Sequence, residues 1–204
     1  MKKISKKKHL EMLIQNIPNH PKPKVDLEQY STPATIAADL LWNAYSLGDV
    51  VNKNIMDLGC GTGIFAISSK LLGAHSAIGV DIDKDSIDLA SDYCSDVKFI
   101  CSDICDLSND FDVNTIFQNP PFGSQKNAKK GQDLKFINKA IDLSFDVLYS
   151  FHMASTEEFL VDYFNKKDLE ITHIFRYNFP IPKIYKFHTK ESSNVEVIVI
   201  RALL

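Results

Sequence analysis

The 204-residue sequence lacks any apolar run close to the ~18–20 residues that a membrane-spanning helix requires. Its lysine-rich start is followed by neither an apolar core nor a small-residue cleavage site, so it does not resemble a secretory signal. Internal repeats and low-complexity tracts are also absent. With 45% apolar and 24% charged residues, the composition is typical of a soluble globular protein, and the length fits a single domain over residues 1–204.

Cysteine is scarce, and no two cysteines have the C-x-x-C spacing. No histidine cluster accompanies them, so the sequence predicts neither a structural zinc site nor another metal site. Unpaired cysteines of this kind are typical of reduced thiols, and we expect a cytoplasmic protein. The four residues are Cys60, Cys94, Cys101 and Cys105.

The net charge of −3 conceals an uneven distribution of charge along the chain. Residues 81–112 contain ten acidic residues and two lysines. Basic residues instead gather in three clusters, two of which flank candidate site segments, and a polyanion such as RNA would be attracted to them. The clusters are five lysines within residues 1–8 with Lys22 and Lys24, then Lys126, Lys129, Lys130 and Lys135, and finally Lys183, Lys186, His188 and Lys190.

The first 32 residues are predicted to form an N-terminal segment of the domain. Apolar residues recur at helical spacing over 2–17, and the proline-rich stretch 18–23 then excludes regular structure. A second helix should begin at Thr32 and Pro33, because threonine is a good N-cap and proline suits the first helical position. We expect a helix and a lid or substrate-binding segment over 1–32, and a core over 33–204.

The core region alternates between β-type and helical patterns. Such alternation predicts an α/β fold with a mostly parallel, doubly wound, Rossmann-like sheet. The last two β-type runs are joined by too short a link for a crossover helix, so they should form an antiparallel hairpin. The seven predicted strands are 54–58, 77–80, 97–101, 113–117, 147–150, 169–179 and 194–203, and the predicted helices after position 60 are 64–72, 85–94, 134–145 and 155–167.

Polar residues stand where four of the predicted parallel strands end. They are Asp57, Asp81, Asp103 and Asn119. Because ligands bind beyond the carboxyl ends of the strands in open α/β sheets, these side chains should surround one ligand. The loop after Asp57 has the G-x-G-x-G pattern, whose missing Cβ atoms allow a ligand to approach the backbone.

The acids indicate which ligand this is. A carboxylate at Asp57 would repel a pyrophosphate but would hold an ammonium group. Asp81 is placed to accept hydrogen bonds from ribose hydroxyls. Asp103 can accept from an adenine amine, with the backbone of Ile104 nearby. An ammonium group, a ribose and an adenine together describe S-adenosylmethionine.

A stiff loop follows the strand at 113–117. Its two prolines lack N–H groups and have fixed φ angles, and the first one biases Asn119 toward an extended conformation. The side-chain oxygen of Asn119 and the carbonyl of Pro120 can both accept hydrogen bonds from a planar amine. Pro121 stiffens the loop, and the ring of Phe122 can cover the face of the group that carries the amine. A proline turn after a buried strand is the structural alternative.

These motifs resemble class I S-adenosylmethionine-dependent methyltransferases, and the sequence Asn119-Pro120-Pro121-Phe122 resembles the branch that methylates exocyclic or amide nitrogens. In their order along the chain they are similar to the methyltransferase-like protein 5 family and its archaeal relatives, which install N6-methyladenosine in small-subunit ribosomal RNA. The motifs that carry the resemblance lie at residues 27–32, 57–63, 81–83, 119–123 and 185–188.

The resemblance implies roles for individual residues. The catalytic segment would be Asn119, Pro120, Pro121 and Phe122. The S-adenosylmethionine site would comprise Gln29, Thr32, Asp57, Gly59, Gly61, Thr62, Ile64, Asp81, Ile82, Asp103, Ile104 and Asn119, although Thr62 stands where some relatives have cysteine. The RNA would be bound by Tyr30, Lys126, Lys129, Lys130, Lys186, Phe187, His188 and Lys190. The eukaryotic family member also works with a small zinc-containing activator, which would pair here with an edge strand at Val97–Cys101.

Two other functions remain compatible with the residues. A protein glutamine methyltransferase also binds a planar amide nitrogen, but such enzymes commonly carry tyrosine at the position of Phe122, and the lysine clusters favour RNA. A non-catalytic RNA-binding assembly factor could retain the fold. The presence of Asp57, Asp81 and Asn119 argues against that second alternative.

Overall fold

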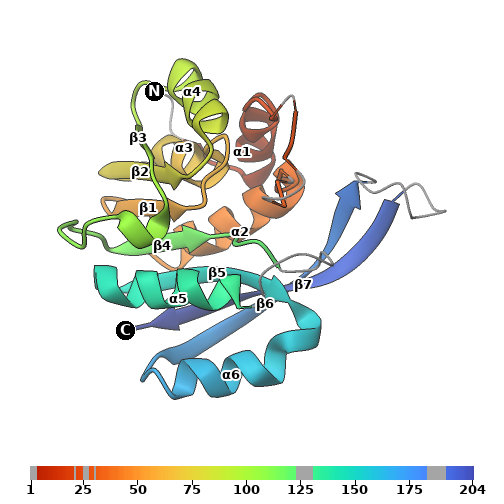
Figure 1. Cartoon of the computed structure of the whole chain (residues 1–204). Coiled ribbons are helices and arrows are strands. Elements are labelled where there is room, and N and C mark those ends of the chain that lie inside the picture. Colours follow the sequence, from red (N-terminus) through yellow and green to blue (C-terminus); the bar gives the residue numbers. More distant parts are fainter. Residues whose placement is uncertain (1–3, 21, 25–27, 30, 123–130, 183–191) are drawn as a thin grey trace.

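A seven-stranded sheet with the order β3-β2-β1-β4-β5-β7-β6 forms the centre of the molecule (Figure 1). The computed structural model of the chain describes residues 4–20, 22–24, 28–29, 31–122, 131–182 and 192–204. Its strands are β1 (Asn54–Leu58), β2 (Ser76–Asp81), β3 (Lys98–Cys101), β4 (Thr115–Gln118), β5 (Val147–Met153), β6 (Glu170–Pro182) and β7 (Ser192–Leu203).

The first five strands are parallel, and β6 and β7 form the predicted antiparallel hairpin. β1 pairs with β2 on one side and with β4 on the other, so the strand order reverses between β1 and β4. The carboxyl ends of β1, β2 and β4 therefore lie together at one edge of the sheet, around the switch point. This is the place where α/β sheets bind ligands. The predicted fold class is confirmed, and β3 lies at an edge of the described sheet as expected.

Two apolar layers cover the two faces of the sheet. One cluster of buried side chains joins the N-terminal helices and α3 to one face, and the second joins α5 and α6 to the other face. In the first layer the rings of Phe65, Phe117 and Tyr149 stack in a row, with centroids 5.6 and 5.0 Å apart. The helices are α1 (Lys7–Ile14), α2 (Ala34–Ser46), α3 (Ile64–Leu71), α4 (Lys84–Tyr93), α5 (Gln132–Leu143) and α6 (Glu157–Asn165), with short 3-10 turns η2 (Ile104–Asp106) and η3 (Ala154–Thr156).

The N-terminal predictions need two corrections. The first helix is α1, which is shorter than the predicted 2–17, although Ile4 and Ile17 outside it are still buried. The predicted N-cap at Thr32 is wrong, because α2 begins at Ala34 with Pro33 as its N-cap. The hydroxyl of Thr32 is used elsewhere, since it accepts a hydrogen bond from Asn119.

The C-terminal strands extend further than their pattern predicts. β5 continues to Met153 because it pairs with β7 along its whole length, from Val147 opposite Leu203 to Met153 opposite Val197. Beyond that point β7 pairs with β6 alone, and the hairpin projects past the rest of the sheet (Figure 1). Among the described residues, no helix is long and apolar enough to cross a membrane.

Candidate active site

The loop between β1 and α3 turns at three glycines, all with positive φ. The N–H groups of Gly59 and Cys60 donate to the carbonyl of Val80, at 2.8 and 3.0 Å, so this loop is tied to the end of β2. Gly61 has φ of 53°, and a Cβ atom there would meet nothing within 4 Å. Because Gly61 also lines the large cavity at this end of the sheet, its backbone is open to a ligand.

Asp81 braces the glycine loop from the end of β2. Its Oδ2 accepts from the N–H of Gly61 at 2.8 Å, and its Oδ1 accepts from the N–H of Asp83 at 2.8 Å. Burial raises the pKa of Asp81 above its ordinary value. Each carboxylate oxygen can accept more than one hydrogen bond, so ribose hydroxyls can still be bound from the cavity that Asp81 lines.

Asp57 lies beneath the glycine loop and does not line the cavity. Its side chain is 1% exposed, and Oδ2 accepts from the N–H of Ala66 at 3.1 Å. Burial raises the pKa of Asp57 to about 7. The structure therefore does not show Asp57 at the cavity surface, and the contact with an ammonium group stays a prediction.

Asp103 follows β3 on the far side of the cavity. Its Oδ1 accepts from the N–H of Cys105 at 2.9 Å, so Asp103 caps η2. The side chain is exposed and lines the cavity together with Ile104. The cap orients this carboxylate, which leaves it available to a ligand amine.

Asn119 follows β4 and contacts the N-terminal segment. Its Nδ2 donates to Oγ1 of Thr32 at 3.1 Å, while its Oδ1 is buried and has no hydrogen-bond partner among the described residues. A buried amide oxygen without a partner carries a substantial desolvation cost, of about 1–3 kcal/mol. Since both residues line the cavity, a ligand N–H is the partner that this oxygen would accept.

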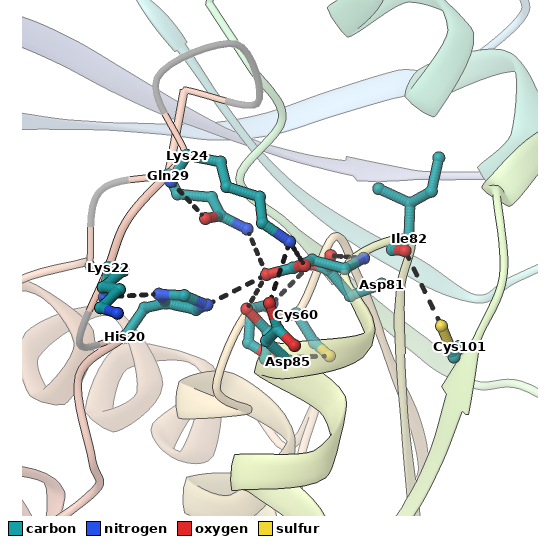
Figure 2. A network of polar contacts seen from close by, with 12 residues as sticks. His20, Lys22, Lys24, Gln29, Cys60, Asp81, Ile82, Asp85 and Cys101 are labelled. Carbon is teal, nitrogen blue, oxygen red and sulfur yellow. Dashed lines mark hydrogen bonds and ion pairs between the residues drawn. The ribbon is translucent and has the colours of Figure 1, made fainter.

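The segment before α2 contacts one carboxylate, Asp83, through three side chains. Figure 2 shows these side chains, His20, Lys24 and Gln29, pointing toward the neighbourhood of Asp81 and Asp85. The Asp83 side chain accepts from Lys24 Nζ, from Gln29 Nε2 at 2.8 Å and from Ser86 Oγ at 2.9 Å. His20 Nε2 lies 3.1 Å from the same carboxylate. Burial opposes ionisation, but the hydrogen bonds from Lys24, Gln29 and Ser86 hold the pKa of Asp83 well below its ordinary value.

The same neighbourhood has a geometry that suits a cation. Ligand atoms of His20, Asp83 and Asp85 lie within 4.8 Å of one another. The ammonium group of Lys24 contacts both carboxylates, with Nζ 3.1 Å from Oδ2 of Asp85. Lys24 therefore places a positive charge between these two acids.

A cavity of about 870 Å³ lies between the glycine loop, the N-terminal segment and the strand ends described above. It is bordered by the N-terminal segment, the glycine loop, the ends of β2, β3 and β4, and the start of α5. The predicted site residues that line it are Gln29, Thr32, Gly59, Gly61, Thr62, Ile64, Asp81, Ile82, Asp103, Ile104, Asn119 and Pro121. Pro120 is buried and Phe122 is half-buried against the core, and neither lines the cavity.

Comparison with known proteins identifies the family. Residues 33–144 match the methyltransferase small domain. The uncharacterized protein MJ0284 of Methanocaldococcus jannaschii is 42% identical over 96% of this chain and 93% of its own length. The rRNA N(6)-adenosine-methyltransferase Mettl5 of Drosophila melanogaster is 35% identical over 94% of this chain and 93% of its own length. The crystal structure of a putative RNA methyltransferase, PH1948 from Pyrococcus horikoshii, superposes with a TM-score of 0.87 at 33% identity, covering 98% of both chains.

The chain belongs to the methyltransferase small domain family. It is a class I, S-adenosylmethionine-dependent methyltransferase. The resemblance that the sequence motifs indicate is thereby confirmed.

Several predicted residues of this methyltransferase lie outside the described part of the chain. They are Tyr30, Lys126, Lys129, Lys130, Lys186, Phe187, His188 and Lys190. Their roles in binding the substrate stay predictions.

The structure also adds residues to the methyltransferase site that sequence reasoning missed. Phe136 of α5 covers the glycine loop, since a Cβ on Gly59 would lie 3.0 Å from its ring. His20, Glu28 and Cys60 also line the cavity. Phe136 is one of several apolar residues in its helix, and no local pattern marks His20 or Glu28 as site residues. Cys60 could have been found, because it lies within the G-x-G-x-G loop.

Proposed function

We propose that the protein transfers a methyl group from S-adenosylmethionine to N6 of an adenine in structured RNA, and that small-subunit ribosomal RNA is the substrate. The observation that carries the proposal is the buried Asn119 Oδ1 at the cavity wall, for which the described part of the chain offers no hydrogen-bond partner. The names of two relatives agree with it, since the similar proteins of Danio rerio and Drosophila melanogaster are named rRNA N(6)-adenosine-methyltransferases.

The residues around the cavity fit S-adenosylmethionine, which supplies a methyl group on a positively charged sulfur when bound. Asp81 and Asp103 line the cavity from the ends of neighbouring strands, as acceptors for the ribose hydroxyls and for the adenine amine of the cofactor. The open backbone at Gly61 lets the ligand lie against the loop. Gln29 and Thr32 border the cavity from the N-terminal segment, and Ile82, which is 54% exposed, offers an apolar surface to a base.

Asn119 would bind the amine to be methylated from the cavity wall, and the carbonyl of Pro120, which follows it in the chain but does not line the cavity, is the predicted second acceptor. The nitrogen lone pair of an adenine amine is delocalised into the ring, so the amine is a weak nucleophile. Acceptors at Asn119 Oδ1 and the Pro120 carbonyl would hold its two N–H bonds and favour a more tetrahedral nitrogen, whose lone pair then faces the methyl group. Catalysis of this kind depends on alignment and local electrostatics. It needs no strong general base during the attack, because the nitrogen releases its proton only after the N–C bond has formed and the S–C bond has broken.

RNA binding would place the target adenine beside Asn119, at the border of the cavity. A base has to leave its stack to be reached by the amine site, and Phe122 together with Tyr30 or Phe187 would stack on it. The lysines after position 125 and near position 190 would contact phosphates, so binding should weaken as salt rises. Lys135, which is exposed at the cavity border, would belong to the same surface.

A small zinc-containing activator would bind at the edge of the sheet. β3 pairs only with β2 among the described strands, so one side of its backbone is available for another strand. Strand addition at such an edge is a common mode of recognition. The activator is proposed because of the resemblance to the methyltransferase-like protein 5 family.

The experiment that tests the function is a methylation assay on unmodified small-subunit ribosomal RNA. The purified protein and methyl-labelled S-adenosylmethionine should yield N6-methyladenosine in the digested RNA at one position. Asn119→Ala should lose transfer while its Kd for the cofactor, measured by calorimetry, stays within about twofold. Turnover close to the wild-type value in that variant, or label found only in protein, would refute the proposal.

A further inference from the structure

Behind the amine site, four buried or half-buried polar side chains form a chain of contacts. Gln118 of β4 donates from Nε2 to Ser150 Oγ at 2.8 Å. Ser150 Oγ lies 2.7 Å from His152 Nε2, and His152 Nδ1 lies 3.4 Å from Oδ2 of Asp133. Gln118 and Ser150 are 0% exposed and His152 is 1% exposed, so this chain crosses the apolar layer between the sheet and α5.

The serine, histidine and aspartate resemble a hydrolytic triad in composition, but they do not form a reaction centre. Ser150 is completely buried and its oxygen already accepts a hydrogen bond from Gln118. A nucleophile has to reach its substrate, and none of these three residues lines the cavity. The chain therefore acts through other residues.

The hydrogen bonds of this chain run in one direction, from Gln118 to Ser150 and from Ser150 to His152. Ser150 Oγ accepts from Gln118, so its hydroxyl hydrogen is free to be donated to His152 Nε2. The ring proton then lies on Nδ1, which is 3.4 Å from Oδ2 of Asp133 and has no hydrogen-bond partner among the described residues, so this last contact is electrostatic. Burial lowers the pKa of His152, so the ring is neutral near pH 7, as an accepting Nε2 requires. Among the described residues, the ring of Phe164 of α6 packs edge-on against the imidazole, with centroids 6.3 Å apart.

The two ends of this chain of polar contacts lie next to Asn119 and at the start of α5. Gln118 directly precedes Asn119, and Asp133 is in the first turn of α5. Gln118 Oε1 and Asn119 Oδ1 are both buried without a partner among the described residues. Two adjacent unsatisfied acceptors are costly in a folded protein, and such costs are tolerated where function requires the arrangement.

We propose that the buried chain Gln118–Ser150–His152–Asp133 holds the end of β4 against α5, and that it thereby positions Asn119 and the Pro120 carbonyl for methyl transfer. The inference rests on the proposed amine site. Ser150 and His152 are positioning residues, because they act on the substrate through Gln118. Small displacements of such a site have large effects on rate even when binding is unchanged.

The test measures kcat per cofactor-binding site with unmodified small-subunit ribosomal RNA. Ser150→Ala should lower kcat by about 10- to 100-fold, with the Kd for S-adenosylmethionine unchanged within about twofold. His152→Gln places an acceptor near the position of Nε2, so it should retain more activity than His152→Leu. Counting sites by cofactor titration removes the contribution of misfolded protein, and thermal unfolding reports stability separately.

Two controls separate the possible outcomes. Ser68→Ala removes another fully buried hydroxyl, on α3 and away from the cavity, and Asp142→Asn changes an exposed acid on α5; both should leave kcat unaltered. Absence of transfer by the wild-type protein would refute the proposed function. If the wild type transfers the methyl group, two results would overturn the positioning chain alone. One is a kcat of Ser150→Ala within about threefold of the wild-type value, and the other is an equal loss of kcat in His152→Gln and His152→Leu.

Discussion

Thr32 and Asn119 are 87 positions apart in the sequence, yet Thr32 Oγ1 accepts a hydrogen bond of 3.1 Å from Asn119 Nδ2. The bond uses the donor end of the amide, and within the described ranges of the chain the acceptor end has no hydrogen-bond partner. Thr32 belongs to the segment that Asp83 holds over the cavity through Gln29. The side chain of Asn119, the proposed acceptor for the amine, is therefore anchored by the same segment that borders the cavity.

The first prediction concerns Thr32. Thr32→Val keeps the shape of the side chain but removes the hydroxyl, so the amide of Asn119 loses its anchor. We expect kcat to fall by about tenfold, because the amide then samples orientations that present Nδ2 to the substrate amine. Single-turnover kinetics at saturating cofactor would measure this change. Thr32→Ser restores the hydroxyl and serves as the matched control; if it loses as much activity as Thr32→Val, the hydrogen bond is not what matters.

The second prediction concerns Asp83. Asp83→Asn removes the charge that binds Lys24 and weakens the contacts with Gln29 and His20. The N-terminal segment should then separate from α4 more often, and the Kd for S-adenosylmethionine should rise by about tenfold, which corresponds to about 1.4 kcal/mol. Calorimetry measures the Kd, and limited proteolysis should show faster cleavage before α2.

The control for this variant is on the same helix. Asp88→Asn disrupts an exposed i,i+4 pair with Lys84, and surface pairs of this kind contribute little. It should bind the cofactor as the wild type does. Unchanged cofactor affinity in Asp83→Asn would mean that the segment closes over the cavity without this carboxylate.

Some of this site follows from the sequence, and some of it depends on packing that no local pattern records. The strand–helix alternation predicts that Asp81, Asp103 and Asn119 meet at one end of the sheet, because parallel strands place their carboxyl ends together. It does not predict that Thr32 contacts Asn119 and does not cap α2, since N-cap preference is a local property. His152 lay beyond the predicted strand 147–150, whose extension depends on pairing with β7.

The third prediction concerns the free edge of the sheet. If a zinc-containing activator adds a strand to β3, the backbone amides of Lys98–Cys101 should exchange with solvent more slowly in the complex. Hydrogen exchange with and without a saturating amount of that protein measures the effect. Amides of β1, which is flanked by β2 and β4, serve as the internal control and should not change. Unaltered exchange in β3 at saturation would exclude this strand as the binding site.

The last prediction is a pH dependence that arises from Asp57. Burial raises its pKa from 3.8 to about 7, so the folded protein keeps the proton between about pH 4 and pH 7 while the unfolded chain releases it. The free energy of unfolding therefore falls as pH rises through this range, and the full penalty is present above pH 7. Asp57→Asn removes the penalty. Relative to wild type, the cofactor-free variant should gain on the order of 2–4 kcal/mol between pH 4 and pH 8.

Urea unfolding at several pH values measures this difference. The proposed role in binding the cofactor's ammonium group predicts the opposite effect on affinity, because an asparagine cannot supply the negative charge. Asp57→Asn should thus be more stable than wild type at pH 8 without the cofactor and should bind it more weakly. A stability difference that does not vary with pH would show that Asp57 is ionised throughout in the folded protein, and unchanged affinity would remove Asp57 from the cofactor site.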